Sequence, residues 1–244
     1  MDRRFLGFLS VCALLALLFF YVPDLDIAVA SLFFSPNGSF RLDDDYAAGL
    51  LQLILPWITG SFATLCLGQL AINYIFRRHP LKPKMRFQAS NRSVIFLLLA
   101  LGLGPGLVVN GIFKDHWGRA RPRDVVEFGG NKRFTAAFVL SDQCESNCSF
   151  VSGEAAIGFY GLAFMFVARR RRKAIVLASL LFGSLIGFVR MSRGAHFLSD
   201  VIFSGVFTFL VSYLLYLLLL RPTQSIISSQ AMAAETKQSP EKLA

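Results

Sequence analysis

The sequence predicts an all-α, polytopic integral membrane protein with six transmembrane helices. Of its 244 residues, 55% are hydrophobic and 25 are phenylalanine, a composition too apolar for an ordinary soluble domain. The apolar residues gather in blocks close to the length of about 20 residues that crosses a bilayer core. Because backbone inside a membrane must satisfy its own hydrogen bonds, these blocks are expected to be helices.

The predicted spans are residues 5–22, 51–76, 93–113, 149–168, 174–189 and 201–220, within one membrane domain over residues 1–221. Arg3 and Arg4 precede the first block, and Ala28-Val29-Ala30 resembles the cleavage site of a signal peptide. The block is longer than a usual signal core, and the resembling site lies beyond Pro23 and two acids. We therefore expect the first block to be a retained span. The fifth block is the shortest.

The formal net charge of +10 follows the predicted topology. Lys and Arg cluster before the first block, between the second and third, between the fourth and fifth, and at Arg221 after the last. The positive-inside rule places these segments and both termini in the cytoplasm. The opposite side carries acids, including Asp24 and Asp26. The basic excess therefore indicates no nucleic-acid partner, and the polar segment 222–244 is expected to be a mobile cytoplasmic tail without a catalytic role.

The predicted external loops hold two features that resemble metal sites. Cys144 and Cys148 could form a disulfide in an oxidising periplasm, or remain unbridged. A zinc pair is disfavoured, because no His or further Cys nearby completes a ligand set. The acidic triplet Asp43-Asp44-Asp45 would point in different directions on a solvated loop. The sequence therefore predicts neither a metal nor a cofactor.

Three polar clusters adjoin the predicted spans at the external face. They comprise Lys114 with Arg121, the stretch from Val151 to Glu154, and Arg190 with His196 and Asp200. Ionisable groups at such positions are costly, so they carry a presumption of function.

The first chemistry that these clusters suggest is anion binding. Lys114 and Arg121 are seven residues apart, which on a helix is two turns and nearly one face. Arg190 would add a third cation, and arginine binds phosphate oxygens bidentately. The amides of Ser152 and Gly153, at the start of the fourth span, would point into the same region. Together these groups predict a phosphate site.

The second chemistry is nucleophilic attack. His196 and Asp200 are spaced i, i+4, so the carboxylate could orient the imidazole and raise its basicity. Glu154 has two interpretations. It could simply lie in the first turn of a helix capped by Ser152, where the helix dipole favours a negative charge. Alternatively, it could donate a proton to the departing alkoxide of a phosphate ester.

The three clusters resemble the signature motifs of the type 2 phosphatidic acid phosphatase (PAP2) superfamily of membrane lipid phosphatases. The first motif, Lys, six residues, Arg-Pro, is matched by Lys114, Arg121 and Pro122. The third, Ser-Arg, five residues, His, three residues, Asp, is matched by Arg190, His196 and Asp200, with Val189 in place of Ser. The second, Pro-Ser-Gly-His, appears as Val151-Ser152-Gly153-Glu154, which lacks the proline and the family's proton-donating histidine.

The run from residue 104 to 203 is similar to bacterial lipid A 4′-phosphatases, a branch whose second motif ends in an acidic residue. The resemblance implies a PAP2-type helical bundle in the bacterial inner membrane, with its active site facing the periplasm. It implies metal-independent removal of a phosphate, foremost the 4′-phosphate of lipid A, through a phosphohistidine on His196. Asp200 would orient His196, and Glu154 would be the candidate general acid. The phosphoryl oxygens would be held by Lys114, Arg121, Arg190 and the amides of Ser152 and Gly153. The product would carry less negative charge, which would weaken capture of cationic antimicrobial peptides.

Several alternatives stay open from the sequence. The substrate could be the 1-phosphate of lipid A, phosphatidylglycerophosphate or a polyprenyl diphosphate, since all present a lipid-tethered phosphate at the same face. An anion transporter or a structural scaffold is disfavoured, because the span interiors are apolar and the charges gather at one face. The oligomeric state is left open.

Overall fold

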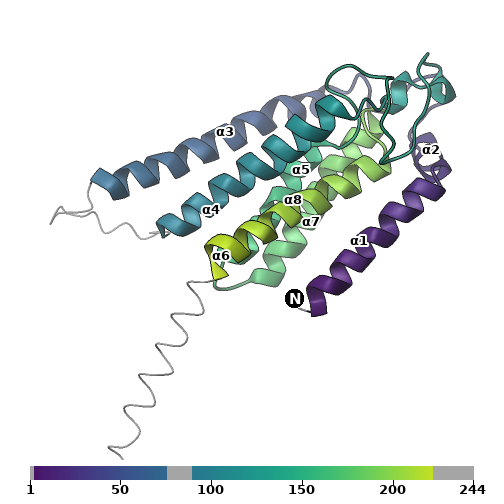
Figure 1. Ribbon diagram of the computed structural model, residues 1–244. Helices are drawn as coiled ribbons and strands as arrows, with labels where there is room; N and C mark the ends of the chain where they lie inside the picture. Colours follow the sequence, from purple (N-terminus) through teal and green to yellow (C-terminus); the bar gives the residue numbers. More distant parts are fainter. Residues whose placement is uncertain (1–2, 76–89, 222–244) are drawn as a thin grey trace, which may run out of the picture.

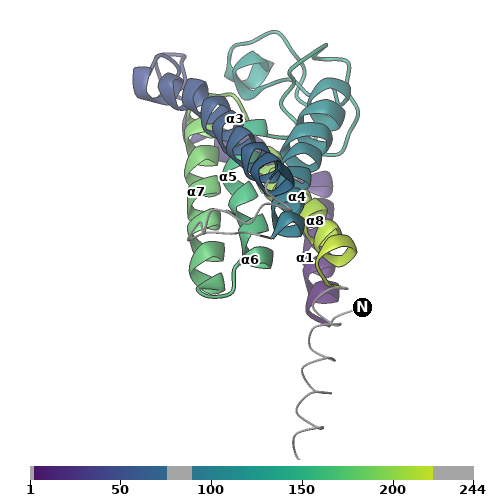
Figure 2. The same cartoon turned by 90° about the vertical axis from the view of Figure 1, so that its left-hand side faces the viewer.

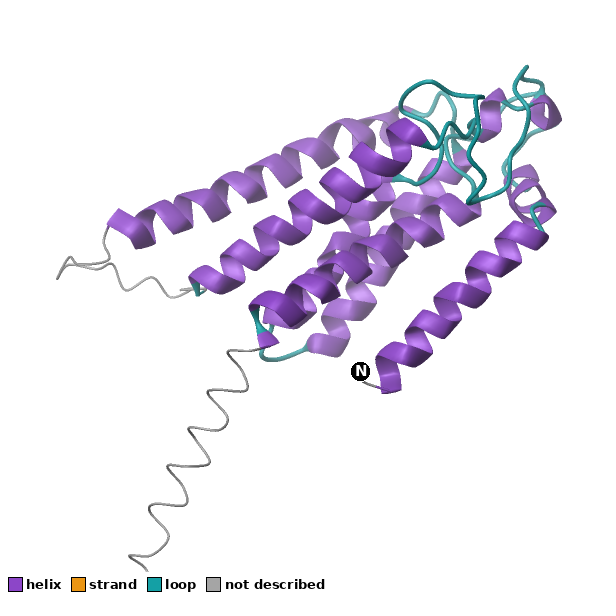
Figure 3. Ribbon diagram, viewed as in Figure 1, coloured by secondary structure: helices purple, strands orange, loops and turns teal. Residues whose placement is uncertain are grey.

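The computed structural model describes residues 3–75 and 90–221, and this part of the chain is almost entirely helical. Long helices run side by side, and most loops gather at one end of the bundle (Figures 1 and 3). Within these residues no β-strand occurs, only two isolated β-bridges. The all-α prediction is confirmed. The basic cluster at residues 77–86 and the predicted tail, 222–244, lie outside the described residues.

The bundle is built from long helices and several short turns. In chain order they are α1 (Arg3–Tyr21), α2 (Asp24–Ser31), α3 (Tyr46–Ile75), α4 (Asn91–Leu101), the π-helix η2 (Gly102–Lys114), the 3-10 turns η3 (Pro122–Asp124) and η4 (Val126–Phe128), α5 (Gly153–Phe159), the 3-10 turn η5 (Tyr160–Ala163), α6 (Phe164–Val167), α7 (Arg172–Ser192) and α8 (Leu198–Leu219).

Four helical segments of the described chain are long and apolar enough to cross a membrane: Tyr46–Ile75, Asn91–Lys114, Arg172–Ser192 and Leu198–Leu219. The first predicted span is α1, which meets α2 at a bend of 83°, and this pair would make a fifth. The segment Gly153–Val167 is apolar but shorter. The structure therefore gives four or five candidate spans by length and composition, rather than the six predicted.

The shortest apolar segment is the fourth predicted block, not the fifth as the sequence suggested. Ser149 and Ser152 stay outside the helix because their amides donate to the carbonyls of Arg119 and Asp200, at 2.9 and 3.1 Å. The fifth block is instead extended at both ends by polar residues that continue α7.

Close helix packing places α5 at the centre of the bundle, between α7 and α8 (Figure 2). A Cβ atom added to Gly158 would lie 2.7 Å from the Cα of Gly183 on α7, so the two glycines allow the backbones to approach. On the other side of α8, Phe5 of α1 stacks on Tyr213 and Phe8 packs edge-on against Phe209. This packing holds the starts of α5 and α8 at the loop end.

The segment after η2 differs from the helix that the spacing of Lys114 and Arg121 predicted. Lys114 and Arg121 do not share a helix face, because the chain turns at Gly118, whose φ of 69° is left-handed. A Cβ there would overlap the Ser141 carbonyl, so only glycine fits this turn. Arg121 is then extended, with φ −82° and ψ 156°. The two cations nevertheless lie close enough to repel each other.

Candidate active site

The His196 imidazole is fully buried in the turn between α7 and α8. Its Nδ1 lies 2.7 Å from the backbone carbonyl oxygen of Ser149. Because that oxygen can only accept a hydrogen bond, Nδ1 carries the proton, and in the neutral ring Nε2 presents a lone pair. Nε2 has no hydrogen-bond partner and lies 3.7 Å from Oε2 of Glu154. The ring is therefore held by one nitrogen and available at the other.

Asp200 contacts the imidazole less directly than the i, i+4 spacing suggested. Its Oδ2 lies 3.7 Å from Nδ1 of His196, too far for a hydrogen bond. Instead, Oδ2 accepts from the Ser149 hydroxyl at 2.5 Å and from the Phe197 amide at 2.7 Å. Asp200 thus acts on the ring through its charge and through Ser149, a residue that the sequence motifs did not single out.

Glu154 lies among three groups of opposite or potentially opposite charge. Its carboxylate oxygens are 3.5 Å from Nη2 of Arg190, 3.7 Å from Nε2 of His196 and 4.0 Å from Nζ of Lys114. None of these distances is a short hydrogen bond. Oε2 of Glu154 and Nε of Arg190 are buried without a hydrogen-bond partner. Buried polar atoms are normally paired, so their convergence with Nε2 of His196 indicates a ligand-binding position.

Arg190 and Arg121 are each held by a residue that lies outside the three sequence motifs. Arg190 donates from Nη1 to the Gln52 side chain on α3, at 2.8 Å. Arg121 donates from Nη2 to the Asn147 carbonyl at 2.6 Å. Burial lowers the pKa of the Arg121 guanidinium from its ordinary value, and repulsion by nearby Arg123 lowers that pKa further.

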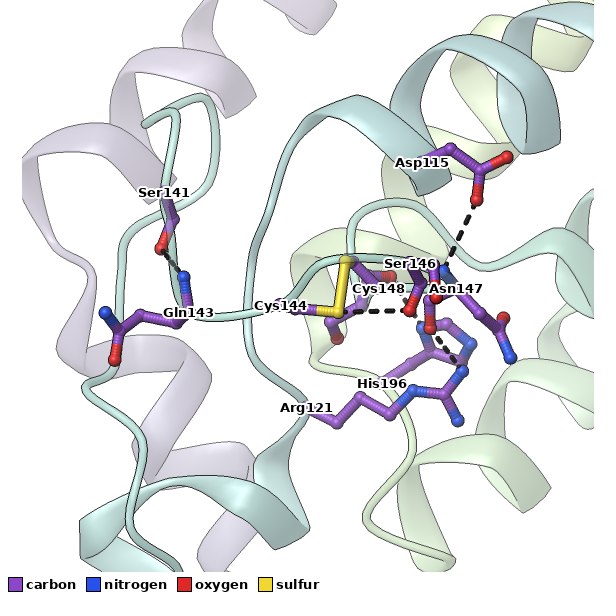
Figure 4. Close-up of a disulfide and its surroundings, with 10 residues drawn as sticks. Asp115, Arg121, Ser141, Gln143, Cys144, Ser146, Asn147, Cys148 and His196 are labelled. Carbon is purple, nitrogen blue, oxygen red and sulfur yellow. Dashed lines mark hydrogen bonds between the residues drawn. A yellow bond between two sulfur atoms is a disulfide. The ribbon is translucent and has the colours of Figure 1, made fainter.

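Cys144 and Cys148 form a disulfide whose Cα atoms are 5.7 Å apart. It closes the turn that presents the Asn147 carbonyl to Arg121 (Figure 4). The Cys148 amide donates to the Lys114 carbonyl at 2.9 Å, which ties this turn to the end of η2. The disulfide therefore fixes the segment between two of the cations.

The stretch predicted to supply phosphate-binding amides begins α5. The Ser152 side chain caps the helix by accepting from the Ala155 amide at 3.4 Å, and the Ser152 amide donates to the Asp200 carbonyl. The hydroxyl oxygen and the amide of Ser152 thus both bond to groups inside the protein. A Cβ at Gly153 would collide with the end of the Asn110 side chain of η2, so glycine allows this close approach without a shift of that side chain.

Residues 93–224, which contain the predicted site residues from Lys114 to Asp200, match the PAP2 superfamily. The chain belongs to the PAP2 superfamily. As a member of this phosphatase family it is a phosphoric monoester hydrolase.

Three curated relatives are similar to this PAP2 protein. A lipid A 4′-phosphatase of Francisella tularensis subsp. novicida is 37% identical over 220 residues, covering 87% of this chain and 94% of the relative. A lipid A 4′-phosphatase of Rhizobium etli is 48% identical over 103 residues, or 42% of this chain and 40% of the relative. A lipid A 4′-phosphatase of Rhizobium leguminosarum is 44% identical over 110 residues, covering 43% of this chain and 47% of the relative. No solved structure matches the chain significantly.

The PAP2 site contains a buried ion cluster that sequence reasoning missed. In the sequence, Arg119 is one of the six spacer residues of the first motif, and Asp26 is one of the acids on the predicted external side. Both are fully buried. Arg119 lies 2.8 Å from Oδ2 of Asp26 and 2.6 Å from Oδ1 of Asp200. An arginine two residues before the motif arginine is a weak signal, and its partner on α2 is 93 residues away in sequence.

The donor set at this PAP2 site suits an anion better than a metal ion. Within residues 3–75 and 90–221, no three His, Cys, Asp or Glu side chains are grouped so that they could hold a metal ion. The groups that do converge are three cations, one imidazole and one carboxylate. They can bind an anion, attack it and exchange a proton with it.

Proposed function

We propose that this PAP2 protein removes the 4′-phosphate from lipid A at the periplasmic face of the bacterial inner membrane, through a phosphohistidine on His196. The observation that carries the proposal is the unpartnered Nε2 of His196, which is buried beside Glu154 and the cations Lys114 and Arg190. The substrate is proposed from the lipid A 4′-phosphatases that the chain resembles, one of them over most of its length.

In the first step, the Nε2 lone pair of His196 attacks phosphorus and the bond between phosphorus and the sugar oxygen breaks. Lys114, Arg121 and Arg190 neutralise the charge on the remaining phosphoryl oxygens. Glu154 gives its proton to the departing sugar oxygen. A phosphate bound among these cations would compete with Glu154 for them, which would favour the protonated carboxyl needed here. The amide of Gly153, at the start of α5, donates to a phosphoryl oxygen, while Ser152 caps that helix and holds it in place.

In the second step, water attacks the phosphohistidine and the phosphorus–nitrogen bond breaks. The Glu154 carboxylate takes the proton from water, and inorganic phosphate leaves. Asp200 supports the positively charged imidazole throughout, both by its charge and by holding Ser149. The protonation states of His196 and Glu154 are restored at the end of the cycle.

We propose that the chain crosses the membrane six times, with α1 as the first span and the short segment Gly153–Val167 as the fourth. The N-terminus and the basic turn before α7 lie at the end of the bundle away from the loops (Figure 1). The positive-inside rule places that end, and both termini, in the cytoplasm. The active site then faces the periplasm, and loss of phosphate would weaken attraction of cationic peptides to the surface.

The decisive experiment uses the purified full-length protein with two samples of lipid A, each labelled at one of its two phosphates. We expect release of the 4′ label and retention of the 1 label. Release of the 1 label, or turnover only of phosphatidylglycerophosphate or a polyprenyl diphosphate, would contradict the proposed substrate. Phosphate release by an equally expressed His196→Ala variant would contradict the proposed nucleophile.

A further inference from the structure

We propose that Arg119, together with Asp26, is a positioning residue of the phosphatase reaction. Arg119 holds Ser149, whose carbonyl accepts from the His196 ring, and Asp200, whose charge lies behind that ring, so that Nε2 faces the phosphate. This inference rests on the proposed role of His196 as the nucleophile. Arg119 itself touches neither His196 nor the predicted phosphate position, so it acts through other residues.

The Arg119 side chain is fully buried and uses three of its nitrogens. Nη1 donates to Oδ1 of Asp200 at 2.6 Å and to the Ser199 hydroxyl at 2.8 Å. Nη2 donates to Oδ2 of Asp26 at 2.8 Å, and Nε donates to the Thr135 carbonyl at 2.8 Å. These contacts join α2, the external loop and the start of α8 through a single planar guanidinium.

The Arg119 backbone reaches the second group that fixes the ring. Its carbonyl accepts the Ser149 amide at 2.9 Å. Ser149 in turn gives its own carbonyl to Nδ1 of His196 and its hydroxyl to Asp200. One residue therefore orders both the acceptor of the imidazole proton and the carboxylate behind it.

The Arg119 guanidinium also packs against the residue that follows His196. Its central carbon lies 4.4 Å from the centroid of the Phe197 ring. The Phe197 amide donates to Asp200. Since the guanidinium and Asp200 both contact Phe197, a shift of Arg119 would move the backbone next to the nucleophile.

Asp26 fixes the start of α8. Its Oδ1 accepts the Ser199 amide at 2.9 Å, and its Oδ2 accepts the Ser199 hydroxyl at 2.5 Å. The chain bends by 83° between α1 and α2, and Asp26 of α2 pairs with Arg119 in the loop after η2. Asp26 therefore ties the amino-terminal part of the chain to the turn that carries His196.

The charges of the cluster also suit the reaction. Two buried carboxylates share one guanidinium, so the cluster of Asp26, Arg119 and Asp200 is negative overall. The imidazole becomes positive when Nε2 bonds to phosphorus. A buried negative charge behind the ring is weakly screened and stabilises that positive charge.

The test compares Arg119→Lys and Asp26→Asn with wild type and with Tyr160→Phe, all as full-length purified proteins acting on lipid A. Lysine keeps the charge, but it cannot form the planar fork that bridges Asp26 and Asp200. We expect kcat to fall by up to about 100-fold in Arg119→Lys, with KM changed by less than about threefold, because nucleophile alignment is lost. Asp26→Asn keeps the size of the side chain and should lower kcat by about tenfold. Tyr160→Phe removes a hydrogen bond far from the site and controls for lost stability.

A spectroscopic measurement separates positioning from a purely structural role. The chain contains three histidines, so the nitrogen-15 ring signals of His196 can be assigned against His196→Ala. We expect one tautomer, protonated at Nδ1, in wild type, and signals shifted toward a mixture of tautomers in Arg119→Lys and Asp26→Asn. Unchanged signals and kcat in a folded Arg119→Lys would overturn the inference.

If Arg119→Lys does not fold, Asp26→Asn takes its place in the test. Unchanged ring signals and an unchanged kcat in a folded Asp26→Asn would then overturn the inference. A wild-type protein that is inactive, or a His196→Ala variant that is active, would instead defeat the proposed function.

Discussion

The two ends of the helical bundle use buried polar groups in opposite ways. At the end away from the loops, Phe96, Phe166 and Leu215 form an apolar cluster in which the Tyr160 hydroxyl is satisfied by the Leu97 carbonyl at 2.8 Å. At the loop end, His196 and Glu154 each bury a polar atom without a partner. Unsatisfied polar atoms are costly in a folded protein, so the loop end gives up stability to keep a site ready for a ligand.

The loop end itself divides into two layers. The inner layer, Asp26, Arg119 and Asp200, is closely paired at 2.6 to 2.8 Å and fully buried. The outer layer, Glu154 with Lys114 and Arg190, is paired loosely at 3.5 to 4.0 Å. A closely paired inner layer beneath a loosely paired outer one is the arrangement expected of a rigid support and a site whose ligand completes it.

The largest expected effect is that of His196→Ala. Removing the imidazole removes Nε2, the proposed nucleophile, so release of phosphate from lipid A should fall to background. Expression and membrane insertion should be normal, because Nε2 has no partner to lose and the ring gives up a single hydrogen bond, from Nδ1 to the Ser149 carbonyl. A malachite-green phosphate assay on equal amounts of purified protein checks this prediction. Retained turnover would show that the orphaned nitrogen is not the nucleophile.

The next largest effect is expected from Glu154→Gln, which keeps the shape but cannot donate a proton. Turnover of lipid A should slow by about 100-fold to 10,000-fold, the usual contribution of a general acid. The loss in the first step, measured as the pre-steady-state burst of released leaving group, should be much smaller with p-nitrophenyl phosphate, whose leaving group needs no proton. Glu127→Gln, on the exposed turn η4, is the matched control. Equal losses of the burst rate on both substrates would assign Glu154 a binding role instead.

A smaller effect should follow from opening the disulfide. In Cys144→Ser/Cys148→Ser, the turn that presents the Asn147 carbonyl to Arg121 loses its closure. Arg121 would then be less ordered, and KM should rise by about threefold to tenfold with kcat little changed, because a charge-assisted contact to phosphate is weakened rather than removed. Cys12→Ser/Cys66→Ser alters the free cysteines within α1 and α3 and serves as the control. An unchanged KM would show that Arg121 is held by other contacts.

A substitution at the end of the bundle away from the loops should change the stability of the protein but not its activity. Tyr160→Phe removes the hydrogen bond to Leu97 and should lower the free energy of unfolding by about 1 kcal/mol. Thermal unfolding followed by tryptophan fluorescence measures this loss, while kcat per folded molecule should not change. A fall in kcat would mean that the two ends of the bundle are coupled.

Chelation should have the smallest effect of all. Lys114, Arg121 and Arg190 supply the charge neutralisation that a divalent ion gives in other phosphatases. Activity should therefore be the same before and after incubation with EDTA. A strict requirement for a divalent metal would contradict the proposal that these three cations neutralise the phosphate.

The sequence alone determined two features of this protein. These are its all-helical class and the grouping of the candidate catalytic residues at one end of the predicted helices. Long apolar blocks can only be helices in a membrane, and charges are excluded from their interiors, so both features can be read without coordinates. The sequence points to His196, Glu154 and Arg190 in this way, and the structure places His196 and Arg190 within 3.7 Å of the Glu154 carboxylate.

Tertiary structure decided how these residues are supported. Whether Lys114 and Arg121 share a face depended on a left-handed turn at Gly118, which local spacing does not reveal. Ser149, rather than Asp200, contacts Nδ1 of His196, and Arg119 pairs with an aspartate 93 residues earlier. The physical reason is that helical periodicity is a local property of the chain, whereas a buried charge is stabilised by whichever opposite charge the fold brings beside it.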